Sequence, residues 1–215
     1  MKINNKKIRF LFIFLCLFPI ITEAQNCSCT ATTAVSNQQR TKAKHADNYN
    51  DFIQKQDTIT VSYIYKWQNK YSSYTQTITV NPNSPASYRK HNTPEDTLYI
   101  LKGYMWFVKT EGNDCDFHIE IGPKSPTGTR VVVEIPKENT ALQSSVKQHL
   151  DDLGLKILNC NISNSANAHF QKGLPVIVTG LGFYDASHKP NTNHGDAHTK
   201  KYSWELHPVK DIVFL

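Results

Sequence analysis

The chain has 215 residues, of which 39% are hydrophobic and 20% charged, and its formal net charge is +6. Residues 1–24 hold four basic side chains and one acidic side chain, so the rest of the chain carries a net charge of only +3. This charge argues against strong non-specific binding to nucleic acid, which requires many side chains that neutralise phosphates.

The first predicted element is a secretory signal peptide over residues 1–24. Basic residues precede an apolar run over residues 10–21, and Ala24 closes a short cleavage segment, as in an n-region, h-region and cleavage site. The run is shorter than the roughly 20 residues that span a bilayer. We therefore predict a secreted or periplasmic protein with no transmembrane segment in its mature form. A lipid-anchored form through Cys27 is the less favoured alternative, because Asn26 is a poor residue for that processing.

Four cysteines remain after removal of the signal peptide. An even number of cysteines in an exported chain predicts disulfides, and the sequence leaves all three pairings open. A metal site at the C-x-C pair is the alternative, but two thiolates without a second nearby pair make a weak site. The cysteines are Cys27, Cys29, Cys115 and Cys160.

Residues 25–96 are predicted to form a polar tail followed by a β-hairpin extension. The stretch from Thr30 to Tyr49 has few large apolar side chains and cannot bury enough surface to order itself. Residues 58–67 and 74–80 alternate β-branched or aromatic with polar side chains, which predicts two strands joined at residues 68–73. A proline-containing breaker segment follows at residues 81–94.

The remaining residues, 97–215, predict a small barrel. A helix is expected over residues 144–155, with Val146, Leu150 and Leu153 at helical spacing, a serine cap and Gly154 as the stop. The five expected strands cover residues 98–110, 117–121, 130–135, 176–183 and 203–215, the last with a bend near Pro208. Three strands, a helix and two strands is the order of an OB-fold, a five-stranded Greek-key barrel. The chain is thus predicted to be mainly β, an OB-fold-like barrel with one helix between strands three and four plus an N-terminal β-extension. A β-sandwich is the alternative.

Polar side chains alternate onto one face of three of these strands. His118 and Glu120 share a face of the second strand, and Glu205 and His207 share a face of the fifth. Strands two, three and five are neighbours in an OB barrel, so this face is expected to collect one polar cluster. Its members are Asp116, His118, Glu120, Glu134, Glu205 and His207. The cluster is interpreted either as a solvated sheet face or as a divalent metal or acid–base site, since imidazole and carboxylate bind Zn²⁺ or Mn²⁺ and move protons.

The loop between the last two strands adds further candidates. Asp185 and His188 begin it, and His194 to His198 form a short segment that could chelate a metal only weakly. Tyr184 is the best candidate among the aromatic residues for stacking on a base or sugar, whereas the others are expected in the core. We therefore predict a ligand-binding set of Asp116, Tyr184, Asp185 and His188.

Four segments in fixed order resemble a widespread group of exported bacterial proteins with an OB-fold-like domain. They are D-x-D-x-H ending at His118, E-x-P starting at Glu134, V-T-G-x-G-F-x-D-x-x-H ending at His188, and E-L-H-P-V starting at Glu205. The group has no settled activity, so the resemblance implies the same site residues without a reaction. The loop over residues 189–201 is longer here than in the group, which removes support for roles of His194 and His198.

Three functions are compatible with these patterns. The leading hypothesis is an exported OB-fold-like protein that binds an unknown small or oligomeric ligand, such as an oligosaccharide or nucleic-acid fragment. The alternative is a nuclease-like, divalent-metal-dependent hydrolase, in which His118, Glu134, Glu205 and His207 are catalytic and His118 and His207 hold the metal. A structural or interaction protein, pairing residues 58–67 with a partner's sheet edge, is the third. No nucleophile elbow, H-E-x-x-H helix or phosphate-binding glycine loop is present.

Overall fold

The computed structural model describes residues 49–71, 92–111, 114–155, 157, 170–185 and 203–215. The predicted signal peptide, the tail up to residue 48 and the predicted strand at residues 74–80 lie outside these ranges. So do His188, His194 and His198, and so do all the cysteines of the predicted mature chain except Cys115. What was predicted for these residues stays a prediction.

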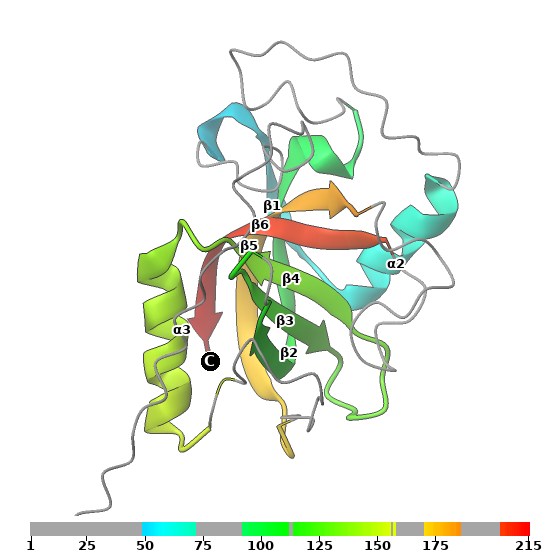
Figure 1. Ribbon diagram of the computed structural model, residues 1–215. Coiled ribbons are helices and arrows are strands. Elements are labelled where there is room, and N and C mark those ends of the chain that lie inside the picture. The colour runs from blue at the N-terminus through cyan, green and yellow to red at the C-terminus, as the bar shows by residue number, and fades with distance from the viewer. Residues whose placement is uncertain (1–48, 72–91, 112–113, 156, 158–169, 186–202) are drawn as a thin grey trace, which may run out of the picture.

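Five strands close into a barrel (Figure 1). The strands are β2 (Thr97–Thr110), β3 (Phe117–Gly122), β4 (Val131–Ile135), β5 (Leu174–Tyr184) and β6 (Trp204–Phe214). Strands β2, β3 and β4 form an antiparallel meander, β4 runs parallel to β6, and β5 pairs with both β6 and β2. This closure confirms the predicted OB-fold-like barrel.

Strand β2 closes the ring because it is long enough to pair with two strands in succession. Residues 98–105 pair with β5, and residues 104–110 pair with β3. The β3 pairing shifts register between Met105 and Phe107, which marks a β-bulge. A bulge bends its strand and increases the local twist, so the two halves of β2 can face different partners.

The barrel interior is filled by every second side chain of its strands. Phe117, Ile119 and Ile121 of β3 belong to one buried hydrophobic cluster with Val133 of β4 and Leu206 of β6. Because strand side chains alternate between faces, the residues between them point to the opposite face of the sheet. That opposite face carries the polar residues singled out from the sequence.

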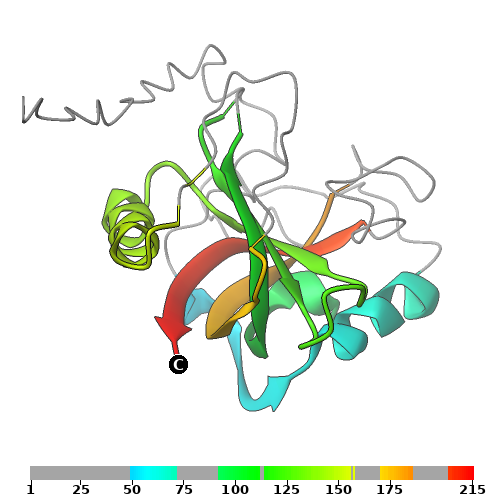
Figure 2. The ribbon, with the colours of Figure 1, turned by 90° about the horizontal axis from the view of Figure 1, so that it is seen from below.

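Helix α3 (Thr140–Asp152) joins β4 to β5, as predicted, but begins four residues earlier than expected. Its cap is Asn139, whose side chain accepts a hydrogen bond from the backbone N–H of Leu142, so the predicted serine cap is wrong. Val146 and Leu150 are buried against the barrel, whereas Leu153 is 51% exposed. In Figures 1 and 2 the helix lies beside the C-terminal end of β6.

The N-terminal extension differs from its prediction. Strand β1 (Ile53–Ile59) pairs in parallel with the start of β2, and this confirms a β-extension. The predicted strand over residues 58–67 is wrong from Val61 onward, because Val61–Lys70 forms helix α2. Val61, Ile64 and Trp67 are buried, which is the three-residue spacing of a helix face. Their packing into the barrel core overrides the β-propensity of the β-branched and aromatic side chains in this segment.

Two short 3₁₀ helices, Tyr49–Asp51 and Pro94–Asp96, lead into β1 and β2. The second is fixed to β5, since Glu95 is fully buried and its Oε1 accepts a hydrogen bond from the backbone N–H of Tyr184 at 3.0 Å. In the part of the chain that the structure describes, no helix is both long and apolar enough to cross a membrane.

Candidate metal centre

Three neighbouring strands bring the polar cluster together on the outer face of the barrel. In the sheet order, β3 lies beside β4 and β4 beside β6. His118 is directly opposite Glu134 in the antiparallel β3–β4 register. The parallel register of β4 and β6 aligns Val133 with Leu206, so Glu134 lies next to His207. The residues that strand alternation selected from the sequence therefore lie together in the structure.

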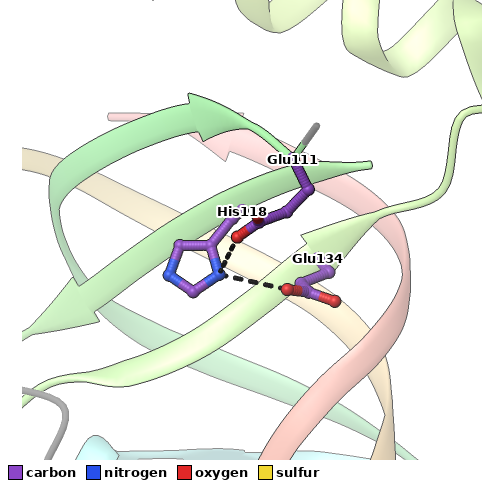
Figure 3. A group of neighbouring side chains, drawn as sticks. All are labelled: Glu111, His118 and Glu134. Carbon is purple, nitrogen blue, oxygen red and sulfur yellow. Dashed lines mark hydrogen bonds and ion pairs between the residues drawn. The ribbon is translucent and has the colours of Figure 1, made fainter. Parts of the chain in front are cut away.

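The first group of side chains lies around the His118 ring (Figure 3). The Nδ1 atom of His118 is 3.1 Å from Oε1 of Glu134 and 3.4 Å from Oε1 of Glu111. Glu111 directly follows β2, and its carboxylate also lies 2.7 Å from the Lys109 ammonium group. The His118 and Glu134 side chains are 3% and 7% exposed, and that of Glu111 is 34% exposed. The group therefore reaches solvent at Glu111.

The second group lies around the His207 ring and is closed. The Nδ1 atom of His207 is 2.7 Å from Oε2 of Glu134 and 3.3 Å from Oε1 of Glu205. The other ring nitrogen, Nε2, is 3.3 Å from Oδ2 of Asp116. His207 and Asp116 have fully buried side chains, and the Glu205 side chain is only 2% exposed. Three carboxylates thus contact one buried imidazole.

Backbone contacts hold Asp116 in place. Its Oδ1 accepts a hydrogen bond from the backbone N–H of Lys137 at 2.9 Å. Its carbonyl oxygen accepts one from the backbone N–H of Glu111, also at 2.9 Å. The second oxygen of the carboxylate, Oδ2, faces His207. Residues from both ends of the β2–β3 connection are therefore fixed relative to the cluster.

The electrostatics of the cluster are shown by Glu205. Burial, followed by the charge of Glu134, raises the pKa of Glu205 to about 7, and the charge of Asp185 acts in the same direction. The hydrogen bond with His207 lowers the pKa but does not offset the other effects. A carboxylate in a low-dielectric site beside like charges holds its proton more tightly. Burial and the neighbouring carboxylates therefore both oppose ionisation of Glu205.

Aromatic rings flank both histidines. The Phe107 ring lies 6.2 Å from His118 in an edge-on arrangement, and the Phe183 ring lies 5.6 Å from His207. Both phenylalanines are buried. Apolar walls limit the access of water and strengthen charge interactions within the site.

Within the described residues, two sets of side chains have the composition and spacing of metal ligands. Glu111, His118 and Glu134 form one set, and Asp116, Glu134 and His207 form the other. In each set, one potential ligand atom per residue lies within 4.8 Å of the others. Imidazole nitrogen with carboxylate oxygen suits Zn²⁺ and Mn²⁺. Glu134 belongs to both sets.

The predicted site residues fall into three classes in the structure. His118, Glu134, Glu205, His207 and Asp116 are brought together, although their roles stay predictions. Glu120 is on the same face but forms a separate buried ion pair with Arg130 at 3.1 Å. Asp185 is buried and influences Glu205, whereas His188 lies outside the described residues.

The predicted stacking residue has a largely structural environment. Tyr184 is half-buried, and its ring lies 5.2 Å from that of Trp204 in an edge-on arrangement. Trp106 is 3% exposed, donates from its indole N–H to the carbonyl of Pro123, and lies under the Arg130 guanidinium group. Trp106 is therefore held inside the structure, whereas the stacking role of Tyr184 stays a prediction.

The sequence did not single out Glu111, Lys109 or Arg130. Glu111 is two residues beyond Lys109, which is paired with His118 in the β2–β3 register. One sequence signal could have identified Glu111. It is a carboxylate one position after the end of a strand, and the next strand carries a histidine. Finding it requires the register, which the bulge in β2 shifts by one residue.

Comparisons with known proteins give no family for this chain. No protein-family model and no curated protein matches it. Two solved structures of Entamoeba histolytica asparaginyl-tRNA synthetase, one of them in complex with asparaginyl-adenylate, are similar to part of it. The complex has 13% identity and a TM-score of 0.33, and the other structure has 11% and 0.30. Each match covers 55% of this chain and 20% of the synthetase.

Proposed function

We propose that the barrel binds a divalent metal ion, Zn²⁺ or Mn²⁺, through the cluster centred on Glu134. One observation carries the proposal: two histidines contact the two oxygens of a single buried carboxylate, and two further carboxylates, Asp116 and Glu111, complete the donor sets. Rigid strands hold His118, Glu134 and His207, which is the preorganisation that a metal site requires.

The charge of the cluster supports a cation. Asp116, Glu134 and Glu205 are all buried, and burial of a carboxylate costs free energy unless a positive charge or hydrogen bonds compensate. The Lys109 ammonium group lies beside Glu111, at the solvent edge. A divalent ion would compensate the inner carboxylates, with the histidines as neutral ligands.

The proposal is tested by metal analysis of the purified full-length mature chain after exposure to Zn²⁺ or Mn²⁺ and removal of free ion. We expect stoichiometric metal in the wild type and its loss in His118→Ala, His207→Ala and Glu134→Gln. The matched control is His149→Ala, because His149 lies on α3, stacks on Phe214 and is not part of the cluster. Circular dichroism of each variant checks that it is folded.

Metal-free wild type, or full metal retention in folded Glu134→Gln, overturns the proposal. Glu134→Gln is included because glutamine has nearly the same shape as glutamate but no negative charge. His207→Ala, by contrast, leaves a buried cavity and can fail to fold. In the case of metal-free protein, the cluster is a buried network in which imidazole and carboxylates share protons.

A second candidate, a metal-dependent hydrolase of the nuclease type, is favoured by the position of Glu205. This carboxylate contacts His207 but belongs to neither ligand set. A metal ion lowers the pKa of a bound water towards about 7, and a carboxylate that does not bind the ion can accept the released proton. Glu205 would have that role, while one of the two ligand sets would hold the ion.

The hydrolase is tested with single-stranded DNA and RNA fragments and a chromogenic phosphodiester, each in the presence of Mn²⁺ or Zn²⁺. Metal-dependent cleavage that is lost in Glu205→Gln, with metal content unchanged, supports it. Equal cleavage by wild type and Glu205→Gln contradicts it. Binding of the same fragments, or of oligosaccharides, without cleavage would favour the ligand-binding protein that the sequence predicts first.

The interaction-protein hypothesis loses its main warrant in the structure. The segment from which it was argued begins as β1 and continues as α2. Strand β1 pairs with β2 of its own barrel, so this pairing needs no partner.

A further inference from the structure

We infer that the cluster is a two-ion centre bridged by Glu134, with a closed inner ion at Asp116 and His207 and an exchangeable outer ion at Glu111 and His118. The inference rests on the proposed metal binding and deepens it, because it specifies the number of ions and a different role for each. Measurement of metal stoichiometry in variants distinguishes a failure of metal binding from a failure of the two-ion arrangement.

The two oxygens of Glu134 have different partners. Oε1 lies 3.1 Å from Nδ1 of His118, and Oε2 lies 2.7 Å from Nδ1 of His207. The carboxylate therefore presents one oxygen to each ligand set. A carboxylate that bridges two ions places them about 3.5–4 Å apart in known two-metal sites. The two sets share this one residue and are otherwise distinct.

The donor chemistry of the two sets is matched, but their exposure is not. Each contains one imidazole, one carboxylate of its own and the shared carboxylate of Glu134. The inner set has fully buried side chains at Asp116 and His207, whereas the Glu111 side chain of the outer set is 34% exposed. A closed metal site is typically structural, and a site that keeps an open coordination position can admit water or substrate.

Charge favours two ions over one. Glu111, Asp116, Glu134 and Glu205 give the centre four carboxylates, and the Lys109 ammonium group lies beside Glu111. An ion in the outer set alone would leave the fully buried carboxylate of Asp116 without a bound cation. A second divalent ion, at Asp116 and His207, would supply that charge.

The test measures metal stoichiometry and chelator release on the full-length mature chain loaded with Mn²⁺ or Zn²⁺. The expected result for wild type is two ions per chain, released to a chelator in a fast and a slow phase. Glu111→Gln should hold one ion and lose the fast phase. Asp116→Asn should hold one ion and lose the slow phase, and Glu134→Gln should lose both. Glu138→Gln is the control, since Glu138 is an exposed carboxylate on the α3 approach, outside both ligand sets.

Paramagnetic resonance of the Mn²⁺ form gives a readout that does not depend on stoichiometry alone. Two carboxylate-bridged Mn²⁺ ions couple magnetically, so wild type should show a coupled spectrum. Glu111→Gln should show the resolved hyperfine pattern of an isolated ion. A merely structural role of Glu111 would leave the coupling unchanged.

The possible outcomes separate the two proposals. Two ions with the expected variant pattern support the two-ion centre. One ion per chain that persists in Glu111→Gln overturns it and leaves the proposed metal binding intact. No bound metal in wild type overturns both. If Asp116→Asn fails to fold, the Glu111→Gln stoichiometry and the resonance spectrum still decide between one ion and two.

Discussion

His207 contacts Glu134 across the parallel pair of strands β4 and β6, with 2.7 Å between Nδ1 and Oε2. The backbone register between these strands is given by Val133 and Leu206, and the contact lies one residue further along each strand. The pairing of β4 with β6, which helps to close the barrel, therefore also brings the side chains of the polar cluster together. A ligand that binds the cluster should stabilise the barrel itself.

The first prediction follows from this coupling. Addition of Zn²⁺ or Mn²⁺ to metal-free wild type should raise the free energy of unfolding, because an ion that binds only the folded state stabilises it by about 2.7 kcal/mol at 100 times its dissociation constant. Denaturant unfolding with and without the ion measures the difference. His149→Ala should keep the effect, and Glu134→Gln should lose it. Identical unfolding curves of wild type in both conditions would contradict the prediction.

The second prediction concerns the buried ion pair of Glu120 and Arg130. Their side chains are 0% and 3% exposed and 3.1 Å apart. Removing one partner of a buried ion pair leaves an uncompensated charge and lowers the free energy of unfolding by roughly 3–5 kcal/mol. We expect a loss of that size in Arg130→Met, and a smaller loss in the double variant Arg130→Met/Glu120→Gln. A double-mutant cycle by denaturant unfolding checks this. A double variant less stable than Arg130→Met would show that the pair is not the dominant interaction.

The barrel was predictable from sequence because its strands keep a period of two on the core face. The alternation of Phe117, Ile119 and Ile121 with polar residues survives in the structure as core and outer face. The convergence of His118, Glu134 and His207 was predictable for the same reason, since neighbouring strands align residues on one face. Strand order and alternation sufficed for this part of the site.

The rest depends on tertiary contacts that local pattern does not contain. Val61 to Trp67 has the β-branched and aromatic composition of a strand, but packing against Tyr99 and Trp204 favours a helix. Glu111 joins the cluster through a loop position beyond a bulged strand, and Arg130 reaches Glu120 from ten residues away. A pattern of alternation assigns a face to a residue in a strand but not to one in a loop.

The third prediction tests how α3 covers the barrel. Leu150 has no exposed surface and belongs to the core cluster, whereas Leu153 is 51% exposed. Leu150→Ala should lower the free energy of unfolding by about 2–5 kcal/mol, as buried leucine truncations do. Leu153→Ala should change it by less than about 0.5 kcal/mol. Equal effects of the two substitutions in denaturant unfolding would mean that the helix does not pack as described.

The fourth prediction concerns the close approach of β5 to the second 3₁₀ helix. A Cβ atom at Gly182 would lie 2.3 Å from the carbonyl oxygen of Pro94 and 2.7 Å from its carbonyl carbon. Backbone must therefore move in Gly182→Ala, and we expect a loss of about 1–3 kcal/mol. Ser145→Ala, at an exposed position of α3, is the control. Unchanged thermal stability of Gly182→Ala would contradict the tight packing of these elements.

The last prediction is the pH dependence that Glu205 gives to the metal-free protein. Its pKa is raised from 4.5 to about 7 by burial and by the charge of Glu134, with Asp185 adding to the effect and His207 opposing it. Between these two values the folded chain holds a proton that the unfolded chain has released, so stability falls as pH rises. The contribution is fully present below about pH 4.5 and lost above about pH 7. At 1.36 kcal/mol per unit of pKa, it amounts to up to about 3 kcal/mol.

Glu205→Gln isolates this contribution because the amide stays neutral over the whole range. Measured in the presence of a chelator, the free energy of unfolding of Glu205→Gln minus that of wild type should grow as pH rises from 4.5 to 7 and then level off. A flat difference for Glu205→Gln would mean that Glu205 ionises as readily in the folded chain as in the unfolded one.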